Sequence, residues 1–233
     1  MKKKISVVGL GYIGLPTALL FASNGYFVNA YDKDEEKIKK LSKKIIPFKE
    51  KGLNKYFAKS LKKKNINFSN QLVESDIYII CVPTPLTNNK KPNMKYVNKA
   101  TQEIIKNLKD NDLIILESTS PVGTTNKIND YISENRPNIK NIKIAYCPER
   151  VLPGNIFFEL INNKRIIGGI NKKSSLAAFG LYSKICKGKI VLTSSSSAEF
   201  VKLLENTYRD INIALSNEIS MLGHEMNINV YDV

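Results

Sequence analysis

Residues 4–32 read KISVVGLGYIGLPTALLFASNGYFVNAYD, and this stretch decides the fold. Two interpretations compete, because the lysines at 2–4 and the apolar run that follows them also resemble a secretory signal peptide. Gly9, Gly11, Gly14 and Pro16 interrupt that run and would break the continuous helix of a signal-peptide core. Residues 9–16 instead have the pattern G-L-G-Y-I-G-L-P, whose glycine spacing favours a nucleotide-binding site.

In a dinucleotide-binding unit the first glycine allows a tight turn, the second admits the pyrophosphate and the third packs the helix on the strand. Residues 4–8 supply the strand, and residues 17–26 supply the helix whose N-terminus faces the phosphates. A second strand, FVNAYD, ends at Asp32, 18 residues after Gly14. A carboxylate there accepts hydrogen bonds from the adenosine ribose and repels a 2′-phosphate, so the sequence predicts NAD rather than NADP.

The rest of the chain alternates short β-branched runs with helix-length segments. This alternation predicts an α/β fold of the Rossmann type, a doubly wound and mostly parallel sheet covered on both faces. The predicted strands are Ile5–Val8, Phe27–Tyr31, Ile77–Val82, Leu113–Glu117, Ile142–Tyr146, Arg165–Gly168 and Ile190–Leu192, and two of the predicted helices are Tyr96–Leu108 and Asn126–Glu134.

From Ser194 the pattern becomes one long helix that runs almost to Val233. Ser196 and Glu199 have the S-x-x-E spacing of a capping box, which predicts the helix start.

The composition, 42% hydrophobic and 24% charged over 233 residues, is that of a soluble globular protein without a membrane-spanning segment. The net charge of +15 admits a nucleic acid or another polyanion as partner. The lysines are scattered among Asn and Ile, however, and no nucleic-acid-binding motif is found, which favours compositional drift over a nucleic-acid interface.

The cysteines and the histidine exclude several kinds of site. Cys81, Cys147 and Cys186 form no CxxC pair, and their odd number argues against a complete disulfide framework. His224 is the only histidine and cannot build a zinc site alone. We therefore expect no metal site and a reducing, cytoplasmic environment.

Ligands of open α/β sheets bind beyond the carboxyl ends of the strands, so the loops there are informative. In CVPTPL, Pro83 and Thr84 form either a rigid loop or a wall beside the cofactor, and both interpretations stay open. In ESTSPVGTT, Thr119 stands at the strand tip. Thr124 or Thr125 could cap the next helix while offering a hydroxyl to an anion.

Two further segments contain charged residues that could bind a substrate. In AYCPERVLPG, Glu149 and Arg150 form either a surface ion pair or substrate-binding machinery, and the proline-framed loop favours the second. In AEFVKLLENTYRD, Lys202, Asn206 and Arg209 lie along one face of a helix that we expect to be otherwise largely buried. A solvated stripe is the alternative, but the neutral donor between two cations favours an anion or oxyanion site.

These segments, in this order, resemble the UDP-glucose/GDP-mannose dehydrogenase family over essentially the whole chain: GLGYIGLPTA, VPTP, ILESTSPVGTT, AYCPERVLPG and AEFVKLLENTYRDINIALSNEIS. STSPVGTT and CPERVLPG resemble the branch that oxidises UDP-N-acetyl-D-mannosamine more than the UDP-glucose branch. The resemblance implies an NAD-binding Rossmann domain over residues 1–193. It also implies that residues 194–233 are the first long helix of a central helical domain, which dimerises and precedes a UDP-binding domain outside this sequence.

The family transfers two hydrides in succession from the sugar C6 to NAD, converting an alcohol to a carboxylate for surface polysaccharide synthesis, and a cysteine thiolate holds the intermediate. The resemblance implies a set of cofactor contacts: Gly9, Gly11, Tyr12, Ile13, Gly14, Asp32, Lys37, Pro83, Thr84, Thr119 and Thr125. It implies catalytic roles for Lys202, Asn206, Glu149 and Thr119. The implied substrate contacts are Arg150, Val151, Lys202, Asn206 and Arg209.

This sequence departs from the family in one feature, the catalytic cysteine. The nucleophile lies in a G-x-G-G-x-C-x-P-K-D stretch, which these 233 residues do not contain. We expect the chain to be the N-terminal portion of the enzyme, to bind NAD without turnover and to dimerise through the helix after Ser197. Alternatives are a UDP-N-acetylglucosamine or UDP-glucose 6-dehydrogenase, and a non-catalytic NAD-binding fragment.

Overall fold

The computed structural model describes residues 3–233, in which eight strands form one sheet of order β3-β2-β1-β4-β5-β6-β7-β8. Strands β1 to β6 run parallel, β7 is antiparallel to β6, and β8 is parallel to β7. The order of the first six is that of a dinucleotide-binding Rossmann fold, which confirms the predicted fold class. The strands are β1 (Lys4–Val8), β2 (Phe27–Tyr31), β3 (Ile66–Ser69), β4 (Ile77–Ile80), β5 (Leu113–Leu116), β6 (Lys143–Tyr146), β7 (Arg165–Gly169) and β8 (Ile190–Ser194).

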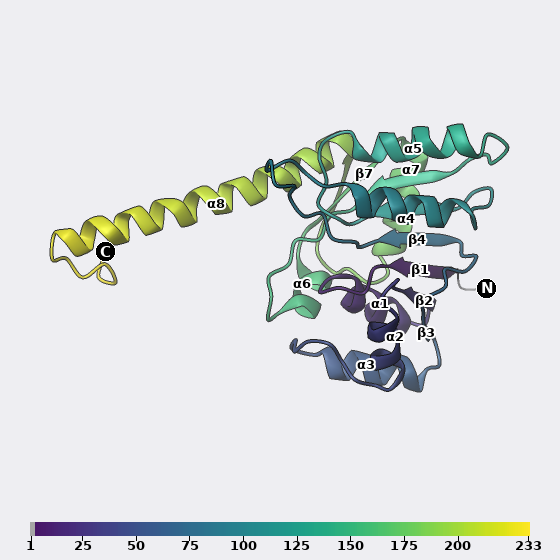
Figure 1. Cartoon of the computed structure of the whole chain (residues 1–233), viewed down its shortest axis with the longest axis horizontal. Helices are drawn as coiled ribbons and strands as arrows, with labels where there is room; N and C mark the ends of the chain where they lie inside the picture. Colours follow the sequence, from purple (N-terminus) through teal and green to yellow (C-terminus); the bar gives the residue numbers. More distant parts are fainter. Residues whose placement is uncertain (1–2) are drawn as a thin grey trace.

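Helices cover both faces of the sheet, and the last helix projects far beyond it (Figure 1). Side chains of α1, α2, α3, α6 and α7 form the core on one face, whereas those of α4, α5 and the start of α8 form the core on the other. The helices are α1 (Gly14–Ser23), α2 (Glu35–Ser42), α3 (Leu53–Lys62), α4 (Lys95–Ile105), α5 (Thr124–Asn135), α6 (Ile156–Asn162), α7 (Lys172–Tyr182) and α8 (Ser195–Glu225).

The central strands are apolar because both of their faces are covered. In β4, Ile77 and Ile79 pack in the core beside α1, while Tyr78 and Ile80 pack in the opposite core beside α4. All four are buried, so a strand in this position cannot show the alternation of a half-exposed strand.

The sequence did not predict strand β3. Its residues, INFS, are partly exposed at the sheet edge and follow a run of lysines, so they carry neither an apolar run nor a clear alternation. The seven predicted strands are confirmed, and none of their ends differs from the prediction by more than two residues.

The predicted capping box at the start of α8 is wrong. Ser194 is the N-cap, and its hydroxyl accepts a hydrogen bond from the Ser197 backbone N–H at 3.1 Å. Glu199 instead turns toward α5 and is completely buried. Its carboxylate accepts hydrogen bonds from Gly123 N (2.6 Å), Thr125 N (2.8 Å) and Thr125 Oγ1 (2.6 Å). Glu199 therefore caps another helix.

The expectation that α8 is otherwise largely buried is also wrong. Lys202 is buried, but Phe200 and Leu204 are about half exposed, because the helix leaves the α/β unit after its first turns (Figure 1). Although α8 spans 31 residues, neither it nor another helix within residues 3–233 is apolar enough to cross a membrane.

Glu199→Ala should lower the free energy of unfolding by about 3 kcal/mol, because it leaves buried donors of the α5 N-terminus without an acceptor. Chemical denaturation of the two proteins measures this difference. The matched control is Glu218→Ala, at an exposed position of the same helix, which should change stability by less than about 0.5 kcal/mol. Equal effects of the two substitutions would contradict a capping role for Glu199.

Candidate cofactor and substrate site

The glycine-rich turn after β1 leaves no room for side chains at two of its three glycines. Gly9 has a φ of +96°, and a Cβ there would lie 2.8 Å from the Cys81 carbonyl oxygen. A Cβ on Gly14 would collide with the Gly9 carbonyl oxygen. At Gly11, in contrast, a Cβ would meet no protein atom within 4 Å. The first and third glycines are thus required by packing, and the second borders open space.

The N-terminus of α1 opens onto this space. Its N-cap is Ile13, no side chain caps it, and its first turn contains no acidic residue. The N-terminus of α5, at the same edge of the sheet, is filled by Glu199. The uncapped amides of α1 and the space at Gly11 fit a pyrophosphate group.

Asp32 lies at the end of β2, where three donors hold its carboxylate. Oδ2 accepts from Leu10 N at 2.8 Å and from Lys37 Nζ at 2.6 Å, and Oδ1 accepts from Asp34 N at 3.0 Å. Asp32 is buried, and its carboxylate is thereby fixed in one orientation. Lys37, a predicted cofactor contact, is therefore adjacent to the predicted ribose ligand.

A cavity of about 510 Å³ lies over the carboxyl ends of β1, β2 and β4. Gly9, Asp32 and Pro83 belong to its wall, and the ring of Tyr96 faces it from α4. The structure thus places Pro83 beside the cavity, while the neighbouring Thr84 is half-buried. The cavity lies at the point where the strand order reverses, which is where dinucleotides bind in this fold.

Tyr12 connects the glycine turn to the loop after β6. Its hydroxyl donates to Glu50 Oε2 at 2.8 Å, and the same carboxylate accepts from Gly154 N at 2.8 Å and Ile156 N at 3.1 Å. The hydrogen bond to Glu50 raises the pKa of Tyr12. Sequence reasoning missed Glu50, because it lies in a lysine-rich segment with no motif around it.

The loop after β5 is held at both of its ends. At the start, Ser118 Oγ donates to the Val82 carbonyl at 2.7 Å, which leaves Thr119 half-buried at the strand tip. At the end, Thr125 is completely buried and its hydroxyl donates to Glu199. The Thr125 hydroxyl therefore bonds to a carboxylate of the protein itself, and its role as a cofactor contact stays a prediction.

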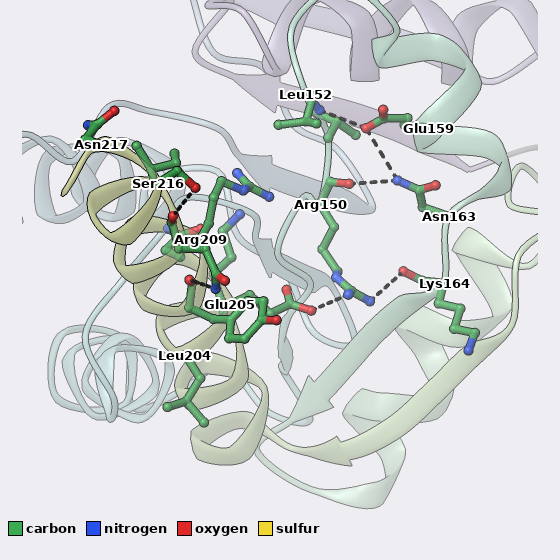
Figure 2. A pocket seen from close by; sticks show the side chains of 16 residues that line it. Arg150, Leu152, Glu159, Asn163, Lys164, Leu204, Glu205, Arg209, Ser216 and Asn217 are labelled. Carbon is green, nitrogen blue, oxygen red and sulfur yellow. Dashed lines mark hydrogen bonds and ion pairs between the residues drawn. The ribbon is translucent and has the colours of Figure 1, made fainter. Parts of the chain in front are cut away.

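A second cavity, of about 980 Å³, lies between α8 and the loop after β6 (Figure 2). Five predicted substrate residues line it together: Arg150, Val151, Lys202, Asn206 and Arg209. Asn206 and Arg209 are exposed, Arg150 and Val151 are half-buried, and Lys202 is buried. The predicted polar stripe of α8 therefore faces a cavity.

Lys202, which lines this cavity, forms an ion pair with Glu149. The Lys202 ammonium donates to Glu149 Oε2 and to the Glu149 backbone carbonyl, both at 2.7 Å. Burial raises the pKa of Glu149, and the nearby Lys202 ammonium opposes this effect. A carboxyl group and an ammonium group in contact can exchange and position protons at a bound substrate.

Arg150 pairs with a different residue of α8. Its guanidinium forms an ion pair with Glu205 and donates to the Lys164 carbonyl at 3.2 Å (Figure 2). The alternative of a surface ion pair between Glu149 and Arg150 is therefore wrong. Glu149 and Arg150 instead each pair with a residue of α8, Lys202 and Glu205 respectively.

A buried polar network lies beneath the glycine turn, and sequence reasoning missed it. Glu117, 1% exposed, accepts hydrogen bonds from Tyr182 Oη (2.6 Å), Arg165 Nη1, Thr17 Oγ1 and Cys81 Sγ (each 3.2 Å). Burial raises the pKa of both Tyr182 and Cys81. The network connects α1, β5, β7 and α7 behind the cofactor cavity.

Within residues 3–233, no group of three or more His, Cys, Asp or Glu side chains is arranged to hold a metal ion. The polar side chains that line the two cavities carry ammonium, guanidinium, carboxylate, amide and hydroxyl groups.

Known proteins share both the sequence and the fold. A UDP-N-acetyl-D-mannosamine dehydrogenase of Methanococcus aeolicus is 50% identical over 232 residues, which are 98% of this chain and 52% of that protein. The structure of the Pyrococcus horikoshii UDP-D-ManNAc dehydrogenase matches with a TM-score of 0.94 at 40% identity, covering 98% of this chain and 56% of the other. The Staphylococcus aureus UDP-N-acetyl-mannosamine dehydrogenase matches with a TM-score of 0.90 at 39% identity, covering 98% and 57%. The chain thus spans about half the length of these relatives.

The family assignment rests on two adjoining matches. Residues 3–186 match the NAD binding domain of the UDP-glucose/GDP-mannose dehydrogenase family, and residues 196–233 match its central domain. The glycine turn, Asp32 and the first cavity lie in the former, and the cavity-facing stripe of α8 lies in the latter. The chain belongs to the UDP-glucose/GDP-mannose dehydrogenase family and contains its NAD-binding domain.

Proposed function

We propose that this chain supplies the NAD site and part of the sugar site of a dehydrogenase that oxidises UDP-N-acetyl-D-mannosamine at C6 to the uronate. The substrate is inferred from relatives with this name at 40–50% identity. The observation that carries the proposal is the contact between Lys202, which lines the larger cavity, and Glu149, a contact that joins α8 to the loop after β6.

The residues present fit NAD. The space at Gly11 and the amides of α1 receive the pyrophosphate, and Asp32 accepts from the adenosine ribose. Lys37, Tyr12 and the loop residues Pro83, Thr84 and Thr119 border the same edge of the sheet. When bound, NAD accepts the hydride that leaves the sugar carbon. Thr125 lies at this edge as a further cofactor contact, with its hydroxyl oriented by the hydrogen bond to Glu199.

The larger cavity supplies the groups that the sugar requires. Lys202 and Asn206 place an ammonium and an amide donor toward the oxygen that gains charge during oxidation. Glu149 activates water or accepts a proton beside Lys202. Arg150, Val151 and Arg209 bind the substrate, the two arginines through its anionic diphosphate.

Residues 1–193 act as the NAD-binding domain, and residues 194–233 begin the helical dimerisation domain. A second copy of the chain would cover the exposed apolar side chains of α8 in a homodimer. The enzyme works in the cytoplasm, where NAD is available and the free thiols of Cys81, Cys147 and Cys186 persist. The apolar side chains of α8 include Phe200, Leu204, Ile211, Leu215, Ile219 and Leu222.

Gly11→Ala should weaken NAD binding by at least about tenfold and leave the melting temperature within about 2 °C of the wild type. The added methyl group meets no protein atom but enters the pyrophosphate path. Gly14→Ala is the matched comparison, because its methyl group collides with the Gly9 carbonyl and should lower the melting temperature itself. Calorimetric titration with NAD and thermal melts separate the two effects. Unchanged NAD affinity in Gly11→Ala would contradict the proposed cofactor position.

The isolated chain should bind NAD without reducing it steadily. A chimaera in which this chain replaces the matching half of the Methanococcus aeolicus relative should reduce NAD when supplied with UDP-N-acetyl-D-mannosamine. In that chimaera, Lys202→Ala should lower kcat by roughly a hundredfold or more, with NAD affinity nearly unchanged. Equal loss of turnover and NAD affinity would show that Lys202 has a structural role only. Faster turnover with UDP-glucose would overturn the proposed substrate.

The acidic limb of the chimaera's pH–rate profile should lie above pH 4.5, the usual pKa of a glutamate, because burial raises the pKa of Glu149. Its carboxylate form is the active one, so activity is present above this raised pKa and is lost as the pH falls through it. Glu149→Gln should remove this limb together with most of the rate. An unchanged limb in Glu149→Gln would assign the titration to another group.

A further inference from the structure

The Glu50 carboxylate bonds to two segments that lie far apart in the sequence, the glycine turn and the loop after β6. Its Oε2 accepts from Tyr12 Oη and from Gly154 N, both at 2.8 Å, and its Oε1 accepts from Ile156 N at 3.1 Å. Burial raises the pKa of Glu50, but these hydrogen bonds outweigh it and bring the pKa below its usual value. The group is therefore an ionised acceptor at neutral pH, and one carboxylate bonds Tyr12 to the loop.

The segment that carries Glu50 is itself packed in place. The Glu50 backbone carbonyl accepts from Leu53 N at 3.1 Å, at the start of α3, and Leu53 is buried. Tyr56 of α3 stacks on Phe157 of α6, with ring centres 4.2 Å apart and ring planes 5° apart. Glu50 is thus held beside α6, next to the loop whose amides it accepts from.

On its other side, Glu50 reaches the position of the pyrophosphate through Tyr12. Tyr12 follows Gly11, where a Cβ would meet no protein atom, and precedes Ile13, the N-cap of α1. A pyrophosphate in that space bonds to the amides of this turn and restricts its backbone. The Tyr12 ring is directed by Phe48, whose ring centre lies 4.7 Å away. A bound pyrophosphate therefore also restricts the hydroxyl that donates to Glu50.

The loop after β6 has a second set of contacts, which stays within its own segment. Leu152 N donates to Glu159 Oε2 at 2.8 Å, and Asn163 Nδ2 donates to the Arg150 carbonyl at 2.9 Å (Figure 2). These bonds connect the loop to α6, whereas the bonds to Glu50 connect it to the glycine turn. The two sets can therefore be removed separately by substitution.

We infer that Glu50 is a positioning residue that couples the two ligand sites: NAD bound at the glycine turn orders the loop after β6 through Tyr12 and Glu50. The loop is then held where Arg150 and Val151 line the larger cavity. Because coupling between two sites is reciprocal, a sugar nucleotide bound by this loop strengthens NAD binding by the same factor. The inference rests on the proposed function only for the ligand of the loop, since its first step involves NAD and amides of this chain alone.

Hydrogen–deuterium exchange of the purified chain, followed by mass spectrometry, tests the inference. Saturating NAD should slow exchange in a peptide spanning residues 150–158 by about fivefold or more. Tyr12→Phe removes the hydroxyl and keeps the ring beside Phe48. Exchange without NAD should therefore stay near the wild-type rate in this variant, while the slowing by NAD is lost. Calorimetric titration of each variant gives the NAD concentration that saturates it.

Two further variants separate coupling from simple support of the loop. Glu50→Ala should speed exchange without NAD and should also lose the slowing by NAD. Glu159→Ala is the matched control, because it removes a carboxylate that bonds to the same loop but not to Tyr12. It should speed exchange without NAD and keep the slowing by NAD.

Three results would overturn the inference: no slowing by NAD in the wild-type chain, slowing that persists in Tyr12→Phe or Glu50→Ala, or loss of the slowing in Glu159→Ala. If Glu50→Ala does not fold, Tyr12→Phe decides, because it removes one hydroxyl and leaves the bonds from Gly154 and Ile156 to Glu50 in place. Because no turnover is measured, failure of the chimaera to oxidise a UDP-sugar would contradict the proposed function and leave this result intact.

Discussion

The passage of helix α1 over the turn after β1 determines where the open space beside Gly11 lies. No side chain fits at Gly14, because its Cβ would collide with the Gly9 carbonyl, and a Cβ at Gly9 would in turn lie 2.8 Å from the Cys81 carbonyl oxygen after β4. Helix α1 is consequently buried along its whole length, and its N-terminus is fixed over the crevice between β1 and β4. Space remains only beside Gly11, where a Cβ would meet nothing. Packing thus creates the cofactor position before any polar group contributes to binding.

The loops around that position are held by carboxylates, although the chain carries a net charge of +15. Asp32 holds the turn after β1, Glu50 holds the N-terminus of α6, Glu199 holds that of α5, and Glu149 receives Lys202 from α8. A carboxylate satisfies several backbone N–H groups within a small volume, and each such group would cost free energy if it were buried without a partner. These four carboxylates therefore fix the loops at this edge of the sheet.

Features that depend on local spacing could be predicted from the sequence, whereas those that depend on packing could not. The glycine turn, Asp32 and the stripe from Lys202 follow from short-range patterns, and the structure brings them to the two cavities. Glu199 has the spacing of a capping residue, but tertiary contact with α5 overrides that local role. The partners of Glu117 lie 36 or more residues away along the chain, so no local pattern could reveal the network. Strand β3 has too little apolar character for its place at the sheet edge to be predicted.

The first turns of α8 connect the loop after β5 with the loop after β6. Glu199 and Lys202 are three residues apart and lie on one face of the helix, and both are buried. Glu199 bonds to the loop after β5, which carries Thr119, whereas Lys202 bonds to the loop after β6, which carries Glu149 and borders the larger cavity through Arg150 and Val151. Because one rigid helix contacts both loops, a rotation of α8 would displace them together. The same helix exposes the apolar surface proposed for dimerisation, so assembly of two chains would also fix the relative positions of these two loops.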